Sequence, residues 1–144
     1  MEKTKRKYCL DAFAVKAFLA GEPGGEKVKD LLQAAQKEKV KIYIHTINLL
    51  EIYYTTLQDV NKSTADEILV RIKDMPVEIV PFKVKDIPII GEIKAHHKVS
   101  LADAFCIATA IEKNAIILTG DPEFKEVEKQ VKIIWLDMTK NPLK

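Results

Sequence analysis

The chain has 144 residues, which is the length of one ordinary domain and enough to bury one core, so we expect residues 1–144 to form a single domain. Its residues are 47% hydrophobic and 31% charged, and no apolar run approaches the roughly 20 residues of a membrane-spanning helix. No signal-type segment follows the charged start, so we expect a cytoplasmic protein. The formal net charge of +2 is too small to identify a nucleic-acid-binding protein by itself.

Short apolar segments rich in β-branched and aromatic residues alternate with segments of helical periodicity. We predict strands over residues 7–10, 41–44, 77–80, 115–118 and 132–135. We predict helices over 26–39, 46–60, 63–73 and 83–96, another from residue 100 onward, and a short one after residue 122. Pro88 is expected either to disturb its helix or to mark the first turn of that helix.

This alternation of strands and helices predicts an α/β fold, in which a mainly parallel sheet is covered by helices on both faces. The two helices at 46–60 and 63–73 are separated only by Asn61 and Lys62, so they are expected to form a helical hairpin. In open α/β sheets, ligands bind beyond the carboxyl ends of the strands. Asp11 follows the first predicted strand and Asp121 follows the fourth, so both acids are expected at that edge.

Glu51 interrupts an apolar helical pattern. Ile47, Leu50, Glu51 and Tyr54 are spaced i, i+3, i+4 and i+7, which places Glu51 on the face that is expected to enter the core. An ionised carboxylate on such a face requires a compensating cation, because burying an unpaired charge is costly.

Asp103 occupies a similar position in the next apolar helix. It shares helical spacing with Cys106, Ile107 and Ala110, and this helix has no wide polar face through which the carboxylate could reach water. Ser100 and Asp103 also fit a capping box, in which the carboxylate would turn back to the Ser100 amide. The pattern leaves both interpretations open.

Asp11 and Asp121 also have a simple structural interpretation. Asp11 can cap a helix that begins at Ala12, and Asp121 followed by Pro122 is typical of a helix start. Taken together with Glu51 and Asp103, however, four buried acids would repel one another unless a divalent cation joined them. Carboxylate oxygens suit Mg²⁺ or Mn²⁺, and such sites hydrolyse phosphoesters with a metal-activated water.

Other site chemistries are less well supported by the sequence. Cys9 and Cys106 lie in apolar segments and are expected to be buried, reduced thiols, and the adjacent His96 and His97 would point in different directions along a helix, so a zinc site is disfavoured. The glycine-rich segment 21–27 lacks the spacing of a phosphate-binding loop.

Basic residues cluster at two places. One cluster is at the start of the chain and the other immediately precedes the helix that carries Asp103, and either can be a solvated surface or a contact for phosphate groups. The clusters are formed by Lys3, Lys5, Arg6 and Lys7, and by Lys94, His96, His97 and Lys98.

Four short motifs occur in order along the chain. They are Cys-Leu-Asp-Ala at 9–12 with Gly-Glu-Pro-Gly at 21–24, Asn-Leu-Leu-Glu at 48–51, Ser-Leu-Ala-Asp-Ala at 100–104, and Ile-Leu-Thr-Gly-Asp-Pro-Glu-Phe at 117–124. With these motifs the sequence resembles the PIN domains and, within that family, the small VapC-type toxin ribonucleases.

The resemblance implies a three-layer α/β/α sandwich with a roughly five-stranded sheet and an acidic pocket that binds magnesium or manganese and cleaves RNA endonucleolytically. It assigns both catalysis and metal binding to the family's four acids and a supporting role to two further residues. The four acids correspond to Asp11, Glu51, Asp103 and Asp121, and the supporting residues to Thr119 and Glu123. Where relatives often carry a small hydroxyl residue behind the first acid, this chain has Ala12 and Phe13.

The resemblance also implies a homodimer and an antitoxin protein whose C-terminal segment enters the active groove, as in type II toxin–antitoxin pairs. Lys16, Lys94 and Lys98 are candidates to contact RNA phosphates, and Tyr53 and Tyr54 can serve either a partner surface or the core. An RNA-processing PIN nuclease outside such a pair, or an inactive RNA- or protein-binding scaffold, remains the alternative.

Overall fold

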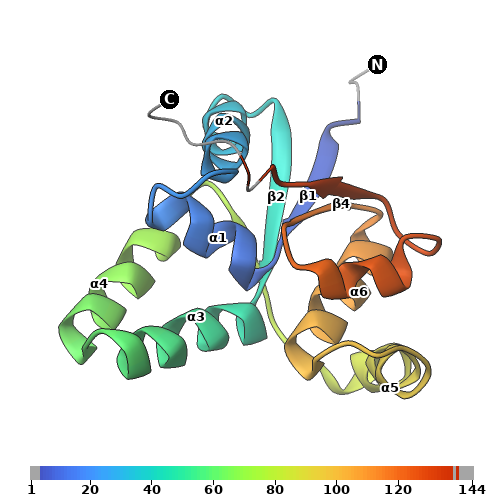
Figure 1. Ribbon diagram of the computed structural model, residues 1–144. Helices are drawn as coiled ribbons and strands as arrows, with labels where there is room; N and C mark the ends of the chain where they lie inside the picture. The colour runs from blue at the N-terminus through green and yellow to red at the C-terminus, as the bar shows by residue number, and fades with distance from the viewer. Residues whose placement is uncertain (1–3, 138, 140–144) are drawn as a thin grey trace.

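The computed structural model describes residues 4–137 and 139, and its central layer is a parallel β-sheet (Figure 1). Lys3 of the first basic cluster lies outside these residues. Within them, five strands pair in the order β3-β2-β1-β4-β5, and every pair is parallel. The strands are β1 (Arg6–Leu10), β2 (Val40–His45), β3 (Glu78–Val80), β4 (Ile116–Thr119) and β5 (Ile133–Trp135). The sequence prediction placed each strand end within one residue of this, so the parallel sheet is confirmed.

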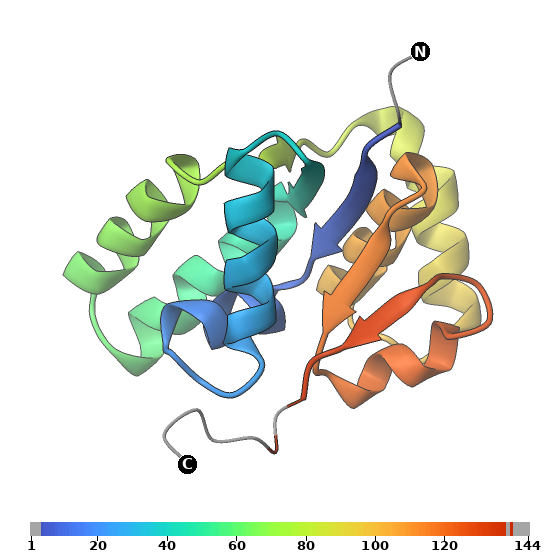
Figure 2. The same cartoon turned by 90° about the horizontal axis from the view of Figure 1, so that it is seen from above.

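Helices connect the strands and cover both faces of the sheet, which confirms the three-layer α/β/α prediction (Figures 1 and 2). They are α1 (Ala12–Leu19), α2 (Gly25–Gln36), α3 (Thr46–Asp59), α4 (Lys62–Lys73), α5 (Ile87–His96) and α6 (Leu101–Lys113), with 3₁₀ turns η1 (Val84–Asp86) and η2 (Pro122–Val127). In the part of the chain that the structure describes, no helix has both the length and the apolar character needed to span a membrane.

Two hydrophobic cores lie on opposite sides of the sheet because side chains alternate along each strand. On β1, Tyr8 and Leu10 pack into the core that is covered by α1, α2, α3 and α4, whereas Cys9 packs into the core covered by α5, α6 and η2. The two thiols are buried and free, as predicted, and the Cys9 and Cys106 sulfur atoms lie 3.7 Å apart. This contact packs β1 directly against α6.

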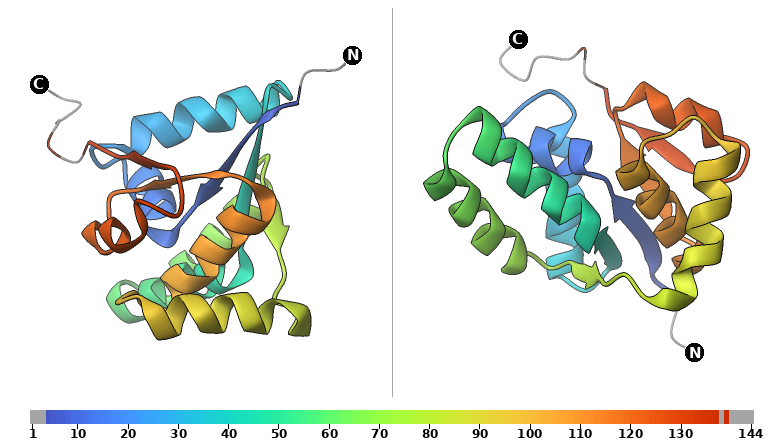
Figure 3. Two further views of the ribbon diagram at one scale, coloured as in Figure 1. Left: turned by 90° about the vertical axis from the view of Figure 1, so that its right-hand side faces the viewer. Right: turned by 90° about the horizontal axis from the view of Figure 1, so that it is seen from below.

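The predicted hairpin of α3 and α4 is confirmed, and its two helices lie side by side (Figure 3). Asn61 starts the second helix, because its Oδ1 accepts a hydrogen bond from the Thr64 amide at 2.7 Å. The tyrosines of α3 divide between two environments: the Tyr53 hydroxyl donates to Asp66 of α4 at 2.6 Å, and Tyr54 is exposed.

The structure corrects the predicted end of α2 and shows which of the two alternatives for Pro88 is right. Helix α2 ends at Gln36 rather than at Lys39, because Glu38 adopts a positive φ of 58° and turns the chain into β2. The residues there are good helix formers, so only the need to return to the sheet ends the helix. Pro88 lies in the first turn of α5, the second of the two predicted alternatives. The helix therefore begins at Ile87 rather than at the predicted residue 83, and Val84–Asp86 form a 3₁₀ turn instead.

Candidate metal centre

The acidic residues meet at the carboxyl ends of β1 and β4, which are neighbours in the sheet. From β1 the chain continues to β2 on one side, while β4 lies on the other side, so this is the point where the strand order reverses. Side chains that follow two strands at such a point share one crevice. The first turns of α3 and α6 approach the same edge, because α3 packs against both α1 and α6.

Asp11 is 1% exposed and both of its carboxylate oxygens accept hydrogen bonds. Oδ1 accepts from the Ala14 amide at 2.8 Å, which caps α1 as the sequence predicted, and Oδ2 accepts from the Thr119 hydroxyl at 2.5 Å. Burial raises the pKa of Asp11 to about 7, and the hydrogen bonds from Thr119 and Ala14 oppose this rise.

Thr119 links the two strands of the site. Besides donating to Asp11, its hydroxyl accepts a hydrogen bond from the Asp121 amide at 3.0 Å. The Asp121 carboxylate in turn accepts from the Glu123 amide at 2.9 Å and so caps η2, as predicted. Helix capping and membership of the acidic cluster therefore do not exclude each other. A carboxylate can cap a helix through one oxygen, while its remaining lone pairs face the crevice.

Asp103 lies in the first turn of α6 and is 5% exposed, which confirms that it does not reach water freely. The Ser100 hydroxyl accepts a hydrogen bond from the Asp103 amide at 3.1 Å, which is one half of the predicted capping box. The Asp103 carboxyl group pairs instead with Glu123. Burial, this carboxyl–carboxyl hydrogen bond and the charges of Asp121 and Asp11 together raise the pKa of Asp103 to about 9.

Asp103, Asp121 and Glu123 form the tightest part of the cluster. One carboxylate oxygen from each lies within 4.8 Å of the others. Glu123 was predicted only as a supporting residue, and the structure brings it as close to the centre as the two aspartates. The sequence feature that could have indicated this closeness is the position of Glu123 two residues after Asp121, at the start of a 3₁₀ turn.

Glu51 lies outside the group of three close acids and interacts with the site only through longer-range charge, and it does not lie on the buried face that the sequence predicted. Leu50 and Tyr54, which were expected to share its buried face, are 56% and 44% exposed. The buried face of α3 is instead formed by Asn48, Leu49, Ile52 and Thr56. Glu51 lies half-buried beside that face, where burial raises its pKa, the charge of Lys16 opposes the rise, and Asp121 and Glu123 add to it.

The composition of the site fits a divalent cation. Among residues 4–137 and 139, none of the five acids has a lysine, arginine or histidine nitrogen within 4.0 Å, since the three ion pairs formed there are Lys41–Glu78, Lys62–Asp66 and Lys85–Glu112. Within the described part of the chain the crowded carboxylates therefore form no ion pair, and Lys16 acts on Glu51 only from a longer distance. Their oxygens are the ligands that magnesium and manganese prefer.

Two buried polar residues at the start of α3 were assigned no role from the sequence. Asn48 is fully buried, and its side-chain amide donates to the Ala102 carbonyl at 3.2 Å, which fixes α3 to α6 beside Asp103. His45 caps α3, because its Nδ1 accepts from the Ile47 amide at 3.0 Å, and burial lowers its pKa. Only the place of His45 at the end of a predicted strand could have suggested this role.

Phe13, the departure from the family pattern, packs against the turn that carries Asp121. A side chain added at Gly120 would overlap the Phe13 ring. An aromatic ring can therefore occupy this position because the residue after Thr119 is glycine. The ring also packs against the core beneath α1.

These features define an α/β/α domain with an acidic pocket at the carboxyl edge of a parallel sheet. The sequence profile of the PIN domain family matches residues 8–130. The chain therefore belongs to the PIN domain family.

Solved structures have the same fold. The chain is similar to a protein in the structure of VapBC2 from Rickettsia felis bound to a promoter DNA fragment, with 21% identity, coverage of 91% of this chain and 99% of that chain, and a TM-score of 0.71. It is also similar to a protein in the structure of DNA-bound VapBC from Salmonella typhimurium, with 15% identity, coverage of 90% of this chain and 97% of that chain, and a TM-score of 0.70. For VapC20 of Mycobacterium tuberculosis, described as a Sarcin-Ricin loop cleaving toxin, the identity is 14%, the coverage is 82% of this chain and 92% of that chain, and the TM-score is 0.64. No curated protein sequence matches the chain significantly.

Proposed function

We propose that the protein is an endoribonuclease that depends on magnesium or manganese and acts as the toxin of a type II toxin–antitoxin pair. The observation that carries the proposal is the cluster of carboxylates at the crevice of a PIN domain, none of which forms an ion pair with a described lysine, arginine or histidine. VapC20, which has the same fold, is described as a toxin that cleaves the Sarcin-Ricin loop. That description supports RNA as the substrate class.

In this proposal Asp103, Asp121 and Glu123 hold the cation most closely, and Asp11 and Glu51 complete its surroundings. A bound divalent ion supplies an activated water and neutralises charge that develops on the phosphate. Thr119 and the Ala14 amide keep the Asp11 carboxylate in one orientation. Glu51 is half-buried with a raised pKa, which suits a group that orients a water and accepts its proton.

We also propose an antitoxin partner and a homodimer. The Rickettsia and Salmonella structures are of VapBC bound to DNA, and they support the first of these by similarity of fold. The exposed apolar side chains Leu50 and Tyr54 of α3, and Val60 directly after it, are surface that a protein partner would cover. Co-expression with the product of a neighbouring small gene, followed by measurement of the mass of the complex, tests both.

The nuclease proposal is tested by RNA cleavage with magnesium, with manganese and with EDTA. We expect cleavage by the wild type in either metal, none in EDTA, and products with a 5′-phosphate and a 3′-hydroxyl. Asp11→Asn and Asp103→Asn should each lower the rate by about 10³-fold or more, on the scale of losing a metal-based activation. Asp30→Asn, an exposed change on α2, is the matched control. Equal traces of cleavage from all variants, or a cyclic phosphate product, would contradict the proposal.

Thr119 provides a further prediction about the pH dependence of cleavage. Thr119→Val keeps the shape of the side chain and removes the hydroxyl that lowers the pKa of Asp11. The pKa of Asp11 should then rise further, so the acidic limb of the pH–rate profile should move to higher pH, with a rate loss of about tenfold near pH 7. Thr119→Ser keeps the hydroxyl and should restore the profile. A uniform rate loss without a shift of the limb would show that the hydroxyl does not act through Asp11.

A further inference from the structure

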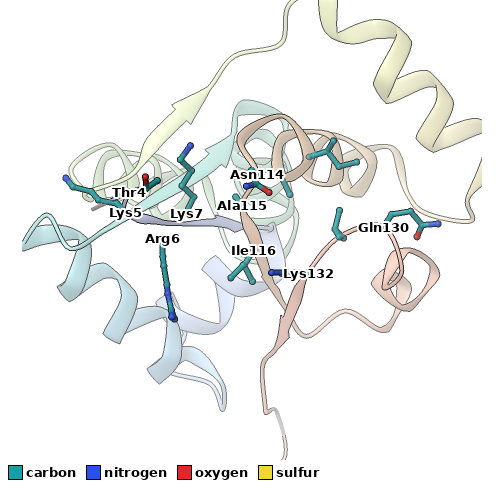
Figure 4. A pocket seen from close by; sticks show the side chains of 12 residues that line it. Thr4, Lys5, Arg6, Lys7, Asn114, Ala115, Ile116, Gln130 and Lys132 are labelled. Carbon is teal, nitrogen blue, oxygen red and sulfur yellow. The ribbon is translucent and has the colours of Figure 1, made fainter. Parts of the chain in front are cut away.

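A second charged depression lies at the opposite edge of the sheet, where β1, β4 and β5 begin (Figure 4). It is a cavity of about 630 Å³ that also reaches the end of α6. The strand β1 separates it from the acidic site, so Lys7 and Asp11 lie about 13 Å apart along a strand that advances about 3.3 Å per residue. The depression is therefore not part of the acidic pocket.

The described lining of this depression is basic. Lys5, Arg6, Lys7 and Lys132 line it, and among residues 4–137 and 139 no aspartate or glutamate does so. In the described chain none of these four side chains has a carboxylate oxygen within 4.0 Å. Within the described residues this depression therefore has a local excess of positive charge, although Glu38, Glu78 and Glu128 line neighbouring depressions, and such an excess favours an anionic ligand.

The arrangement of the cations indicates what kind of anion fits. Arg6 and Lys7 are neighbours on a strand and point to opposite sides of the sheet, as Figure 4 shows, and Lys132 lies beside Ile116. Cations that flank a trough in this way suit successive phosphate groups of one strand better than a single phosphate.

The floor and rim of the trough suit the other parts of a nucleotide. Ala115, Ile116 and Val131 form an apolar floor, which offers contact area to a base or ribose. Asn114 and Gln130 place side-chain amides at the rim, where they can donate to or accept from base edges (Figure 4).

We propose that this depression binds a single-stranded segment of the RNA substrate remote from the bond that is cleaved. The inference rests on the proposed function, since it assumes an RNA substrate. The strand would be held at both edges of the sheet, so RNA long enough to reach both would bind more tightly than short RNA. The contact would be mainly with phosphates and would depend on salt rather than on sequence.

The test compares two triple variants of equal charge in the full chain. Lys5→Gln/Lys7→Gln/Lys132→Gln removes cations of the trough, and the control Lys27→Gln/Lys29→Gln/Lys73→Gln removes three exposed lysines from α2 and α4. Binding of an oligouridine of about 16 nucleotides, the upper site size of single-strand-binding folds, is measured in EDTA by fluorescence anisotropy over a range of salt. Unfolding temperatures establish that both variants fold.

The trough variant should bind the long oligonucleotide about tenfold or more weakly than the wild type, and the slope of log affinity against log salt should fall by about 2, since each phosphate contact contributes about 0.7. The control should change by less than about threefold. Cleavage of a substrate of about 4 nucleotides, the lower site size, should be equal for wild type and trough variant because it needs only the acidic site.

Three results would overturn the inference. If wild type cleaves RNA but the two triple variants bind the long oligonucleotide equally, the trough binds no RNA while the proposed function stands. If uridine monophosphate binds the wild type as tightly as the long oligonucleotide does, a single phosphate is sufficient and no strand is held. If the wild type neither binds nor cleaves any RNA, the proposed function fails together with the inference.

Discussion

Replacing Asp103 by asparagine is expected to raise the free energy of unfolding of the metal-free protein by about 2 kcal/mol or more at pH 7.5, while it abolishes RNA cleavage. Asp103 is buried, and its pKa is raised to about 9, so at this pH the folded protein holds a proton that the unfolded chain releases. Asparagine needs no proton and offers an N–H donor where the protonated carboxyl group donates to Glu123. A residue placed for function rather than stability should behave in this way.

Urea denaturation in EDTA measures this effect, with Asp30→Asn as the matched control. Asp30 is exposed on α2, and its change should stay within about 0.5 kcal/mol of the wild type. If Asp103→Asn were instead less stable than the wild type by more than about 1 kcal/mol, the fold itself would depend on the ionised carboxylate. The cluster would then be a structural ion-pair network, and the metal-centre proposal would lose its basis.

The second large effect is that the metal-free protein should lose stability as the pH rises from 6.5 to 9. The folded pKa values are about 7 for Asp11 and about 9 for Asp103, both above the ordinary value of 3.8, so the folded state binds more protons than the unfolded state. Stability then falls with pH by about 1.4 kcal/mol per pH unit for each proton held, until the pH passes the folded pKa. His45, whose pKa is lowered, acts in the opposite direction only below its ordinary value of 6.5 and so does not contribute in this window.

Thermal unfolding at several pH values, with EDTA and with magnesium, checks this expectation. Without metal the midpoint should fall by about 5 °C or more across the window, given about 2–4 °C per kcal/mol for a chain of this size. With magnesium the fall should be smaller, and the stabilisation by metal should grow with pH, because protons and cations compete for the same oxygens. A midpoint that rises with pH in EDTA, or magnesium that stabilises most at pH 6.5, would contradict a metal site built from these acids.

Much of the fold could be predicted because its signals are local. Apolar segments of strand length alternate with segments of helical periodicity, and this alternation was enough to place each strand end within one residue. Asp11 and Asp121 could be assigned to one edge of the sheet for the same reason, since each directly follows a strand or its turn. The end of α2 could not be predicted from the sequence, because it depends on where the chain must rejoin the sheet.

The composition of the site was less predictable than its location. The face of α3 was predicted wrongly because Ile47, Leu50 and Tyr54 match a helical stripe, whereas the structure buries the polar Asn48 against α6 and leaves Leu50 exposed. A sequence pattern counts apolar residues, but it does not show which neighbouring helix supplies a hydrogen-bond partner. The basic trough was equally hidden, since Lys132 joins the N-terminal lysines only through the pairing of β5 with β4 and of β4 with β1.

By itself, the sequence determined the parallel α/β class, the kinds of ligand atom available and the positions of Asp11 and Asp121 at strand ends. Only the tertiary structure decided that β1 lies between β2 and β4, which brings Thr119 onto Asp11 and gathers Glu51, Asp103 and Glu123 around them. The physical reason is that helix and strand signals arise from neighbouring residues, whereas strand order and the desolvation of the carboxylates arise from the packing of the whole chain.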